Sequence, residues 1–310
     1  MNAAKSLIVA FLSLAMLLPV AAQAQPATYF AGVVQHPATN IPPVQVVARY
    51  SLPLMSGGIN DFSGIATRDG TEIYLLSDHG FIATGRLERG YGQQITGFQL
   101  RQVAVLNDDT GRPLTGSLHD SEGLTIGPDG SIYVSFEQHN RVLRYRRLGG
   151  AGEDLGAHRD FSRLRAGRGL EALAIAGDGA IYAIPERPAR ATYGFPSYRL
   201  RAGVWDGSFR LPEDGSFLPV GADFGPDGQI YVLEREYGAR GFRSQVRRFA
   251  IRGRAISEPQ VVMRSDYGQF GNLEGLSVFR DWNGRTRLLM VADDDLHPDR
   301  SELVDLVLNR

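Results

Sequence analysis

The hydrophobic pattern of the chain consists mainly of short β-type runs separated by glycine-containing turns. Runs such as Ile-Tyr-Val at 132–134 and 230–232 combine β-branched and aromatic residues, and each follows an Asp-Gly pair. Asp-Gly between two such runs favours a tight hairpin turn. Apolar residues at helical spacing are scarce after about the first 24 positions. The pattern therefore predicts an all-β protein made of hairpins.

One phrase recurs five times along the chain. A small or acidic residue precedes a Gly-Leu-like pair, a polar-Gly turn, an Ile-Tyr-Val-like run and, usually, an acid. The copies start 59, 49, 49 and 54 residues apart, at Ser63, Glu122, Glu171, Val220 and Glu274. This period with hairpin turns is typical of β-propeller blades, whereas a pair of β-sandwiches would not repeat one phrase. We expect five blades, or six if a degenerate blade lies in the long first interval or near the N-terminus.

The two ends of the repeat array carry further strand-like segments. A linear array of blades would leave free sheet edges, which a closed ring avoids. Residues 44–50 and 303–308 both have the composition of a strand. We predict that they pair as the closing strands, so that residues 25–310 form a single propeller domain.

The first 24 residues have the features of a secretory signal peptide. Lys5 precedes an apolar run at 7–20, and Ala22-Gln23-Ala24 offers small residues for cleavage. The run is short for a membrane span, and no stop-transfer charges follow it. We expect cleavage after Ala24 and a periplasmic or secreted mature protein without a membrane span.

The composition excludes several kinds of chemistry. The chain has no cysteine, so an exported form has no disulfides and must depend on its apolar core. Lys5 is the only lysine, which excludes catalytic or phosphate-binding lysines from the mature protein. The net charge of −1 gives no electrostatic basis for binding nucleic acid. No Gly-x-Ser-x-Gly elbow indicates a serine nucleophile.

The geometry of a propeller turns the repeat into a prediction of a site. The first strand of each blade lines the channel, and its antiparallel partner returns to the same end. Residues at the start of the first strand and just after the second should therefore meet at one mouth. The first column contains Ser63, Glu122, Glu171, Val220 and Glu274. The second column contains Asp78, Glu137, Glu186, Arg235 and Asp293.

Seven carboxylates in these columns would repel one another at the mouth. A cation, arginines or proton uptake must relieve the repulsion. Val220 and Arg235 interrupt the columns, so we expect an asymmetric mouth, in which Asp223 could replace the missing acid. The alternative is that each acid only ties backbone amides of neighbouring blades.

The residue types at the mouth favour binding of a cation and an anion. Carboxylates without cysteine favour Ca²⁺ or Mg²⁺, and Ca²⁺ is our predicted cofactor. The predicted metal ligands are Glu122, Glu171, Glu274, Asp78 and Asp293. Arginines on the loops that leave the mouth could hold an anionic small molecule such as a phosphoester. They are Arg187, Arg190, Arg235 and Arg240.

Carboxylates and histidines at the same mouth are candidates for general acid–base catalysis. His79 follows Asp78, and His139 lies two residues after Glu137. A histidine beside a carboxylate can transfer protons near neutral pH, although a loop histidine is often only solvated. The predicted catalytic residues are Glu171, Glu137, His79 and His139.

An ordered set of fragments in the chain is familiar from one family. The fragments are FSGI (62–65), SDHG (77–80), GLEAL (169–173), PERP (185–188), LPVGADF (218–224), NLEGL (272–276) and VADDD (291–295). They resemble the bacterial "esterase-like activity of phytase" family over nearly the whole mature chain. The resemblance implies an exported propeller with functionally important acids and a phosphoester-hydrolase activity. The motifs of the calcium-dependent six-bladed phytases are not found in this sequence.

Two classes of function follow from the acidic mouth. The first is a metal-assisted ester hydrolase acting on phosphoesters, with a calcium-dependent lactonase-type hydrolase as a close variant. The second is a non-catalytic periplasmic propeller that holds a ligand or partner at the same mouth.

Overall fold

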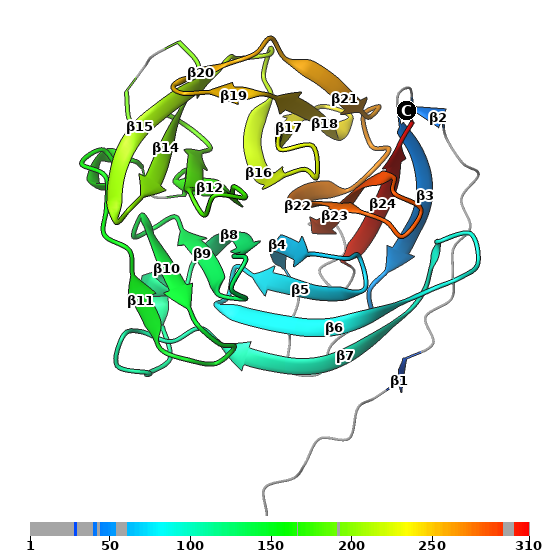
Figure 1. Cartoon of the computed structure of the whole chain (residues 1–310), viewed down its shortest axis with the longest axis horizontal. Helices are drawn as coiled ribbons and strands as arrows, with labels where there is room; N and C mark the ends of the chain where they lie inside the picture. Colours follow the sequence, from blue (N-terminus) through cyan, green and yellow to red (C-terminus); the bar gives the residue numbers. More distant parts are fainter. Residues whose placement is uncertain are drawn as a thin grey trace, which may run out of the picture.

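The computed structural model describes residues 28–29, 40–41, 44–53, 61–165, 167–190, 193–293 and 301–309. These residues form antiparallel sheets arranged as blades around a central axis (Figure 1). The predicted signal peptide at 1–24 lies outside them, as does most of the acidic segment that follows Asp293. Within the described part, no helix has the length and apolar character needed to cross a bilayer.

Five sheets form five blades, and the innermost strands of all five surround the axis (Figure 1). From the axis outwards, blade 1 contains β4 (Phe62–Thr67), β5 (Glu72–Ser77), β6 (Phe81–Arg89), β7 (Ile95–Val105) and β1 (Thr28–Tyr29). Blade 2 contains β8 (Ser121–Ile126), β9 (Ile132–Phe136), β10 (Arg141–Tyr145) and β11 (Gly152–Asp154). Blade 3 contains β12 (Leu170–Ile175), β13 (Ile181–Pro185), β14 (Phe195–Arg201) and β15 (Val204–Leu211).

The remaining two blades complete the ring. Blade 4 contains β16 (Leu218–Phe224), β17 (Ile230–Gly238), β18 (Gly241–Phe249) and β21 (Gln260–Arg264). Blade 5 contains β22 (Asn272–Arg280), β23 (Thr286–Asp293), β24 (Glu302–Leu308), β3 (Val44–Ser51) and β2 (Asn40–Ile41). Strands β19 (Ile251–Arg252) and β20 (Ala255–Ile256) form a small separate sheet. The 3-10 turns η1 (Gly116–Leu118) and η2 (Phe161–Arg163) lie in loops.

Asp-Gly turns join the two inner strands of blades 1 to 4, as the sequence predicts. At one such turn, Asp129 Oδ1 accepts a hydrogen bond of 2.9 Å from the Ser131 amide, and Gly130 has a φ of 86°. Glycine adopts this left-handed conformation without a steric penalty. The aspartate at each equivalent turn accepts the same backbone bond two residues on, which fixes the hairpin register.

The ring closes between the two ends of the chain. Strand β3 pairs antiparallel with β24, with Tyr50 opposite Leu303 and Val44 opposite Leu308 (Figure 1). This confirms the predicted closure. The long first interval of the repeat contains β6 and β7, which are 9 and 11 residues long. Longer outer strands, rather than a sixth blade, therefore account for its length.

The apolar core lies between the blades rather than inside any one of them. Leu75 and Phe98 of blade 1, for example, pack in one cluster with Leu289 and Leu303 of blade 5. Each of the other four blade interfaces has a comparable cluster. Burial of both faces of the sheets explains why the strands are nearly continuous apolar runs. The interfaces hold the inner strands at fixed positions around the axis.

Candidate functional site

A β-bulge occurs at the same position in each of the inner strands. The ladder shifts between Leu170 and Ala172, leaving Glu171 without a partner residue. Ser63, Val220 and Glu274 are left unpaired in the same way, and in blade 2 the shift spans Glu122 and Gly123. A bulge re-aims a side chain out of the regular alternation of a strand. The first predicted column is thus a ring of five bulge residues.

A small residue follows each bulge and brings the inner strands very close together. A Cβ on Gly275 would lie 2.7 Å from the Ile65 amide nitrogen of blade 1, and one on Gly123 would lie 2.4 Å from the Glu171 carbonyl oxygen. The cavity that this ring encloses is about 10 Å³, which is roughly what one water molecule requires. The five small residues, which we call the glycine ring, form a floor to the channel beneath the bulge residues; they are Gly64, Gly123, Ala172, Gly221 and Gly275.

Three carboxylates of blade 2 converge above this floor. One oxygen each from Asp120, Glu122 and Glu137 lies within 4.8 Å of the others, an arrangement that could hold a metal ion. Burial raises the pKa of Glu122 well above its ordinary value, and the charges of Glu171 and Glu274 raise it further. Removing a carboxylate from water and placing it beside others both favour the protonated form.

Glu171 brings the acid of blade 3 to the same place. Its side chain is 9% exposed, and burial, followed by the charge of Glu137, raises its pKa, while Arg235 opposes the shift. The carboxyl groups of Glu137 and Glu171 are close enough to share a proton, and Glu137 Oε2 accepts a hydrogen bond of 3.3 Å from the Gly169 amide. Glu137 thus both faces the site and ties blade 2 to blade 3.

Arg235 occupies the position in blade 4 where the other blades carry an acid. Its guanidinium forms an ion pair with Glu274 of blade 5 and donates a hydrogen bond to Asn272 Oδ1. Asn272 Nδ2 in turn donates a bond of 2.8 Å to Glu274 Oε1. The charges of Glu171 and Glu186 also act on Arg235. The predicted asymmetry is therefore the placement of a cation, Arg235, among the acids.

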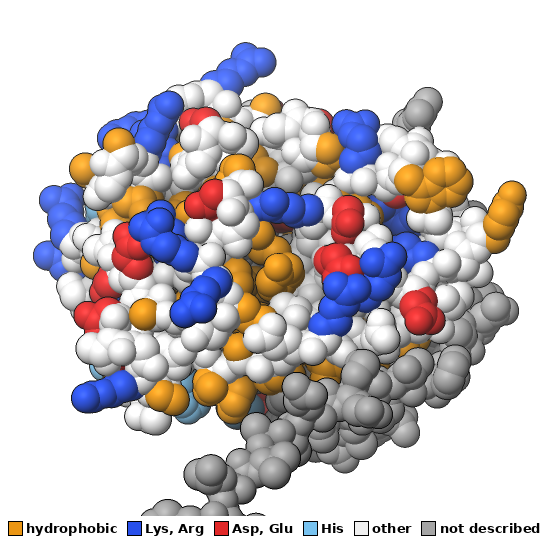
Figure 2. All heavy atoms as spheres, turned by 60° about the horizontal axis from the view of Figure 1, so that its bottom comes forward, with side chains coloured by type: hydrophobic (Ala, Val, Ile, Leu, Met, Phe, Trp, Pro, Cys, Tyr) orange, Lys and Arg blue, Asp and Glu red, His pale blue; other side chains and the backbone are white. Residues whose placement is uncertain are grey.

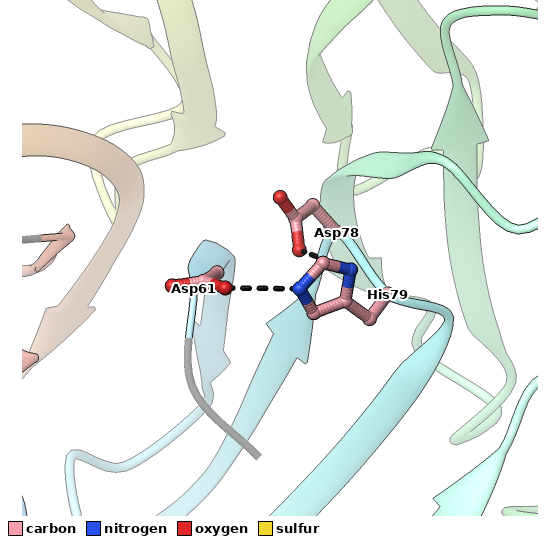
Figure 3. Close-up of side chains that lie close together, drawn as sticks. All are labelled: Asp61, Asp78 and His79. Atoms are coloured by element: carbon pink, nitrogen blue, oxygen red, sulfur yellow. Dashed lines mark hydrogen bonds and ion pairs between the residues drawn. The ribbon is translucent and has the colours of Figure 1, made fainter. Parts of the chain in front are cut away.

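Blade 1 adds a smaller cluster at the rim. Figure 3 shows the imidazole of His79 between two carboxylates, with Nε2 2.9 Å from Asp61 Oδ2 and Nδ1 3.4 Å from Asp78 Oδ1. Burial raises the pKa of Asp78 to about 6 although His79 opposes the shift; Asp61 and Glu274 add to the rise. The buried Asp78 Oδ1 accepts no hydrogen bond of normal geometry. This buried oxygen, which the His79 imidazole approaches without a hydrogen bond, is suited to a cation.

The structure thus brings together Asp78, Glu122, Glu137, Glu171, Glu274 and Arg235, with His79 at the rim. Asp293 ends β23 opposite Asn272, at the position that Asp78 has in blade 1.

Four other predicted residues are exposed and form no ion pair with the acids of the cluster within the described residues. His139 is exposed and lies 2.9 Å from Ser117 Oγ. Arg240 is exposed and lies over the Tyr267 ring, 4.7 Å from its centroid. Arg187 and Arg190 are exposed, and neither forms an ion pair with any described residue. The roles assigned to these residues stay predictions.

Two acids of the site were missed by the sequence analysis. Asp61 and Asp120 both come directly before the inner strand of their blade, two positions ahead of the first column. The Asp61 carbonyl accepts a hydrogen bond of 3.1 Å from the amide of Asp78. The Asp120 carbonyl accepts one of 3.2 Å from the amide of Glu137. A third column at this position, which ends in Asn272, would have found them.

Asp223 does not replace the missing acid of blade 4. Its Oδ2 accepts bonds from the Val278 amide at 2.8 Å and Ser277 Oγ at 3.2 Å, both toward the far end of β22. Ser277 Oγ also accepts a bond of 3.0 Å from the Thr67 amide of blade 1. Asp223 is therefore a tie between blades, because these contacts lie four residues beyond Glu274 and past the glycine ring.

The surface charge is mixed. Figure 2 shows positive and negative side chains interspersed with apolar groups over the face that it presents. This agrees with the net charge of −1 for the whole chain.

The fold and the site define a five-bladed β-propeller with a cluster of carboxylates at one end of a narrow channel. We call this cluster the bowl; it contains Asp78, Glu122, Glu137, Glu171 and Glu274 around Arg235. A family model described as "Phytase-like: Esterase-like activity of phytase" matches residues 57–296. The chain belongs to this phytase-like family. Among curated protein sequences, none matches the chain.

Several solved structures resemble the fold at low sequence identity. A gluconolactonase from Xanthomonas campestris is 14% identical with a TM-score of 0.50, and 89% of this chain and 100% of that chain are covered. An aldose sugar dehydrogenase from Streptomyces coelicolor is 14% identical with a TM-score of 0.45, covering 87% and 100%. Regucalcin, a calcium-binding protein from Agrobacterium tumefaciens, is 15% identical with a TM-score of 0.43, covering 80% and 77%. At these identities, the likeness to the gluconolactonase concerns the fold alone.

Proposed function

We propose that this protein is an exported, metal-assisted ester hydrolase that acts on phosphoesters at the acidic mouth. The observation that carries the proposal is the convergence of acids from blades 1, 2, 3 and 5 around Arg235. A purely structural tie needs one acid per interface, and it does not require carboxylates to raise one another's pKa.

The carboxylates of the bowl suit a hard divalent cation, and Ca²⁺ fits their oxygen-only chemistry. Asp120, Glu122 and Glu137 would hold it, because their oxygens already lie within 4.8 Å of one another. Glu171, Glu274, Asp78 and Asp293 would complete the acidic surroundings. When bound, the cation would polarise the ester and offset the repulsion among the acids.

The chain's own groups would bind the substrate and move the proton. Arg235 would hold the anionic phosphoryl group, since it is the cation in direct contact with the bowl. Glu171 would accept the proton of the attacking water in its ionised form, while Glu137 holds the one proton that the two carboxyl groups share. Glu137 would orient Glu171 through the hydrogen bond that the two share.

The test is Glu171→Gln in the mature protein, assayed with 4-nitrophenyl phosphate and Ca²⁺. We expect the substitution to lower kcat about 100-fold or more, because it removes the proposed base while keeping the size of the side chain. Glu258→Gln, at an exposed position away from the mouth, is the matched control and should keep full activity. Full activity in folded Glu171→Gln would refute the proposal.

The second candidate is a non-catalytic binding propeller. It is favoured by the bond of Glu137 to the Gly169 amide, which is the kind of tie between blades that needs no reaction. A Ca²⁺-dependent rise in Tm without turnover of any phosphoester would support it. Turnover that chelation abolishes would exclude it.

A further inference from the structure

The hairpin of β17 and β18 is longer than its counterparts in blades 2 and 3. By register, Glu234 of β17 corresponds to Phe136 and Pro185, the last residues of β9 and β13. Strand β17 continues for four more residues to Gly238, and β18 begins only at Gly241. At about 3.3 Å per residue, the hairpin extends roughly 13 Å past the strand ends beside the bowl.

One face of this hairpin carries a row that begins in the bowl. Arg235 and Tyr237 alternate onto the same face, and Phe242 is directly opposite Tyr237. The Arg235 guanidinium is paired with Glu274 and lies 5.9 Å from the Phe242 ring centroid. The Phe242 and Tyr237 rings are 4.9 Å apart, and Tyr237 is 75% exposed. The row therefore runs from the acids outward to an exposed aromatic ring.

The opposite face of the hairpin is braced. Tyr267 Oη donates a bond of 2.7 Å to Glu236 Oε1, and Arg243 Nη1 lies 3.4 Å from the same oxygen. The Arg240 and Arg243 guanidinium groups lie 4.7 and 5.4 Å from the Tyr267 ring centroid. These contacts hold the hairpin in place, so Tyr237 and Phe242 do not have to be ordered when a ligand binds.

We infer that the row of Arg235, Phe242 and Tyr237 is a specificity wall, on which a flat ring of the substrate's alcohol group stacks while its phosphoryl group lies at Arg235. An exposed tyrosine supported from behind by another ring is suited to stacking. A phosphoester of a phenol or of a heteroaromatic alcohol has the two matching parts. The inference rests on the proposed function, since it places the alcohol group of the same substrate.

The test uses two non-hydrolysable probes, phenylphosphonate and ethylphosphonate, with calorimetric titration of the mature protein in Ca²⁺. We expect phenylphosphonate to bind more tightly, and Tyr237→Ala to reduce that preference about three- to tenfold. Tyr237→Trp should keep or increase it. Tyr193→Ala is the matched control, because Tyr193 is 78% exposed on the loop after β13 but lies outside the row; it should leave the preference unchanged.

The outcomes separate this inference from the proposed function. Equal binding of the two probes by the wild type, or an unchanged preference in Tyr237→Ala, would overturn the wall. A phenyl preference that depends on Tyr237, in a protein without hydrolytic activity, would support the wall and refute the hydrolase. No measurable binding of either probe would overturn the wall as well.

Discussion

At the scale of single residues, the carboxyl of Asp223 shows how the stability of the fold depends on pH. It accepts three hydrogen bonds, from the amides of Val278 and Phe224 and from Ser277 Oγ. Burial nevertheless raises its pKa from 3.8 to about 7, because the loss of hydration outweighs these bonds. Its protonation state therefore changes close to neutral pH.

This shift makes the folded state less stable at higher pH. Between about pH 4 and 7 the folded protein binds a proton at Asp223 that the unfolded chain has released, so the free energy of unfolding falls as pH rises. We expect Asp223→Asn to reduce the loss of stability between pH 5 and pH 8 by on the order of 1–2 kcal/mol. Urea unfolding of both proteins in the presence of chelator measures it, and parallel pH profiles would contradict it.

The residue scale is also where prediction from the sequence was least complete. The two columns could be predicted because a blade returns its second strand to the end where its first begins. Asp61 and Asp120 were missed because they lie two positions before the start of the repeated phrase. The direction of the Asp223 side chain depends on the bulge at Val220, which no local pattern in the sequence marks.

At the scale of elements, the bulge and the glycine after it form one unit. Gly275 follows the bulge residue Glu274 and packs against the backbone of Gly64 and Ile65 in the next blade. The glycine lets the inner strands approach, while the bulge turns the acid into the mouth. In blades 2, 3 and 5 the sequence has Glu-Gly or Glu-Ala at this unit, but the close contact that requires a small residue appears only when blades are packed side by side.

Gly275→Ala tests this unit. Its Cβ would lie 2.7 Å from the Ile65 amide nitrogen, which is backbone and cannot rotate away. We expect a loss of about 1–3 kcal/mol in the free energy of unfolding, measured by urea denaturation. Gly207→Ala on β15 is the control, because nothing lies within 4 Å of its Cβ. Equal stabilities of the two variants would contradict the close approach of the inner strands.

At the scale of the whole molecule, two kinds of contact close the ring. The pairing of β3 with β24 could be predicted, because a propeller must join its ends and only these terminal segments were left over. The buried ion pairs beside this strand pairing could not be predicted from the sequence. Asp305 of β24 is fully buried and lies 2.6 Å from both Arg287 Nη2 of β23 and Arg89 Nη1 of blade 1. The β6–β7 hairpin of blade 1 thus reaches across to blade 5.

Asp305→Ala should strongly destabilise the ring. It would leave Arg287 buried without this carboxylate, and loss of one partner of a buried ion pair costs about 3–5 kcal/mol. Arg49→Ala removes the partly exposed pair of Arg49 and Glu302 on the same seam and should cost about 1 kcal/mol or less. Urea unfolding compares the two variants. A similar loss in both would show that the buried contact does not hold the ends together.

The glycine ring affects the route by which molecules enter and leave the bowl. The space among the inner strands has room for about one water, so an organic ligand that reaches the acids has no room to move further between these strands. A ligand that binds at the acids would therefore enter and leave through the mouth on their side of the ring. Substrate and product would then use one passage. In the proposed hydrolysis, phosphate that is still bound would occupy the site of the next substrate and act as a competitive inhibitor.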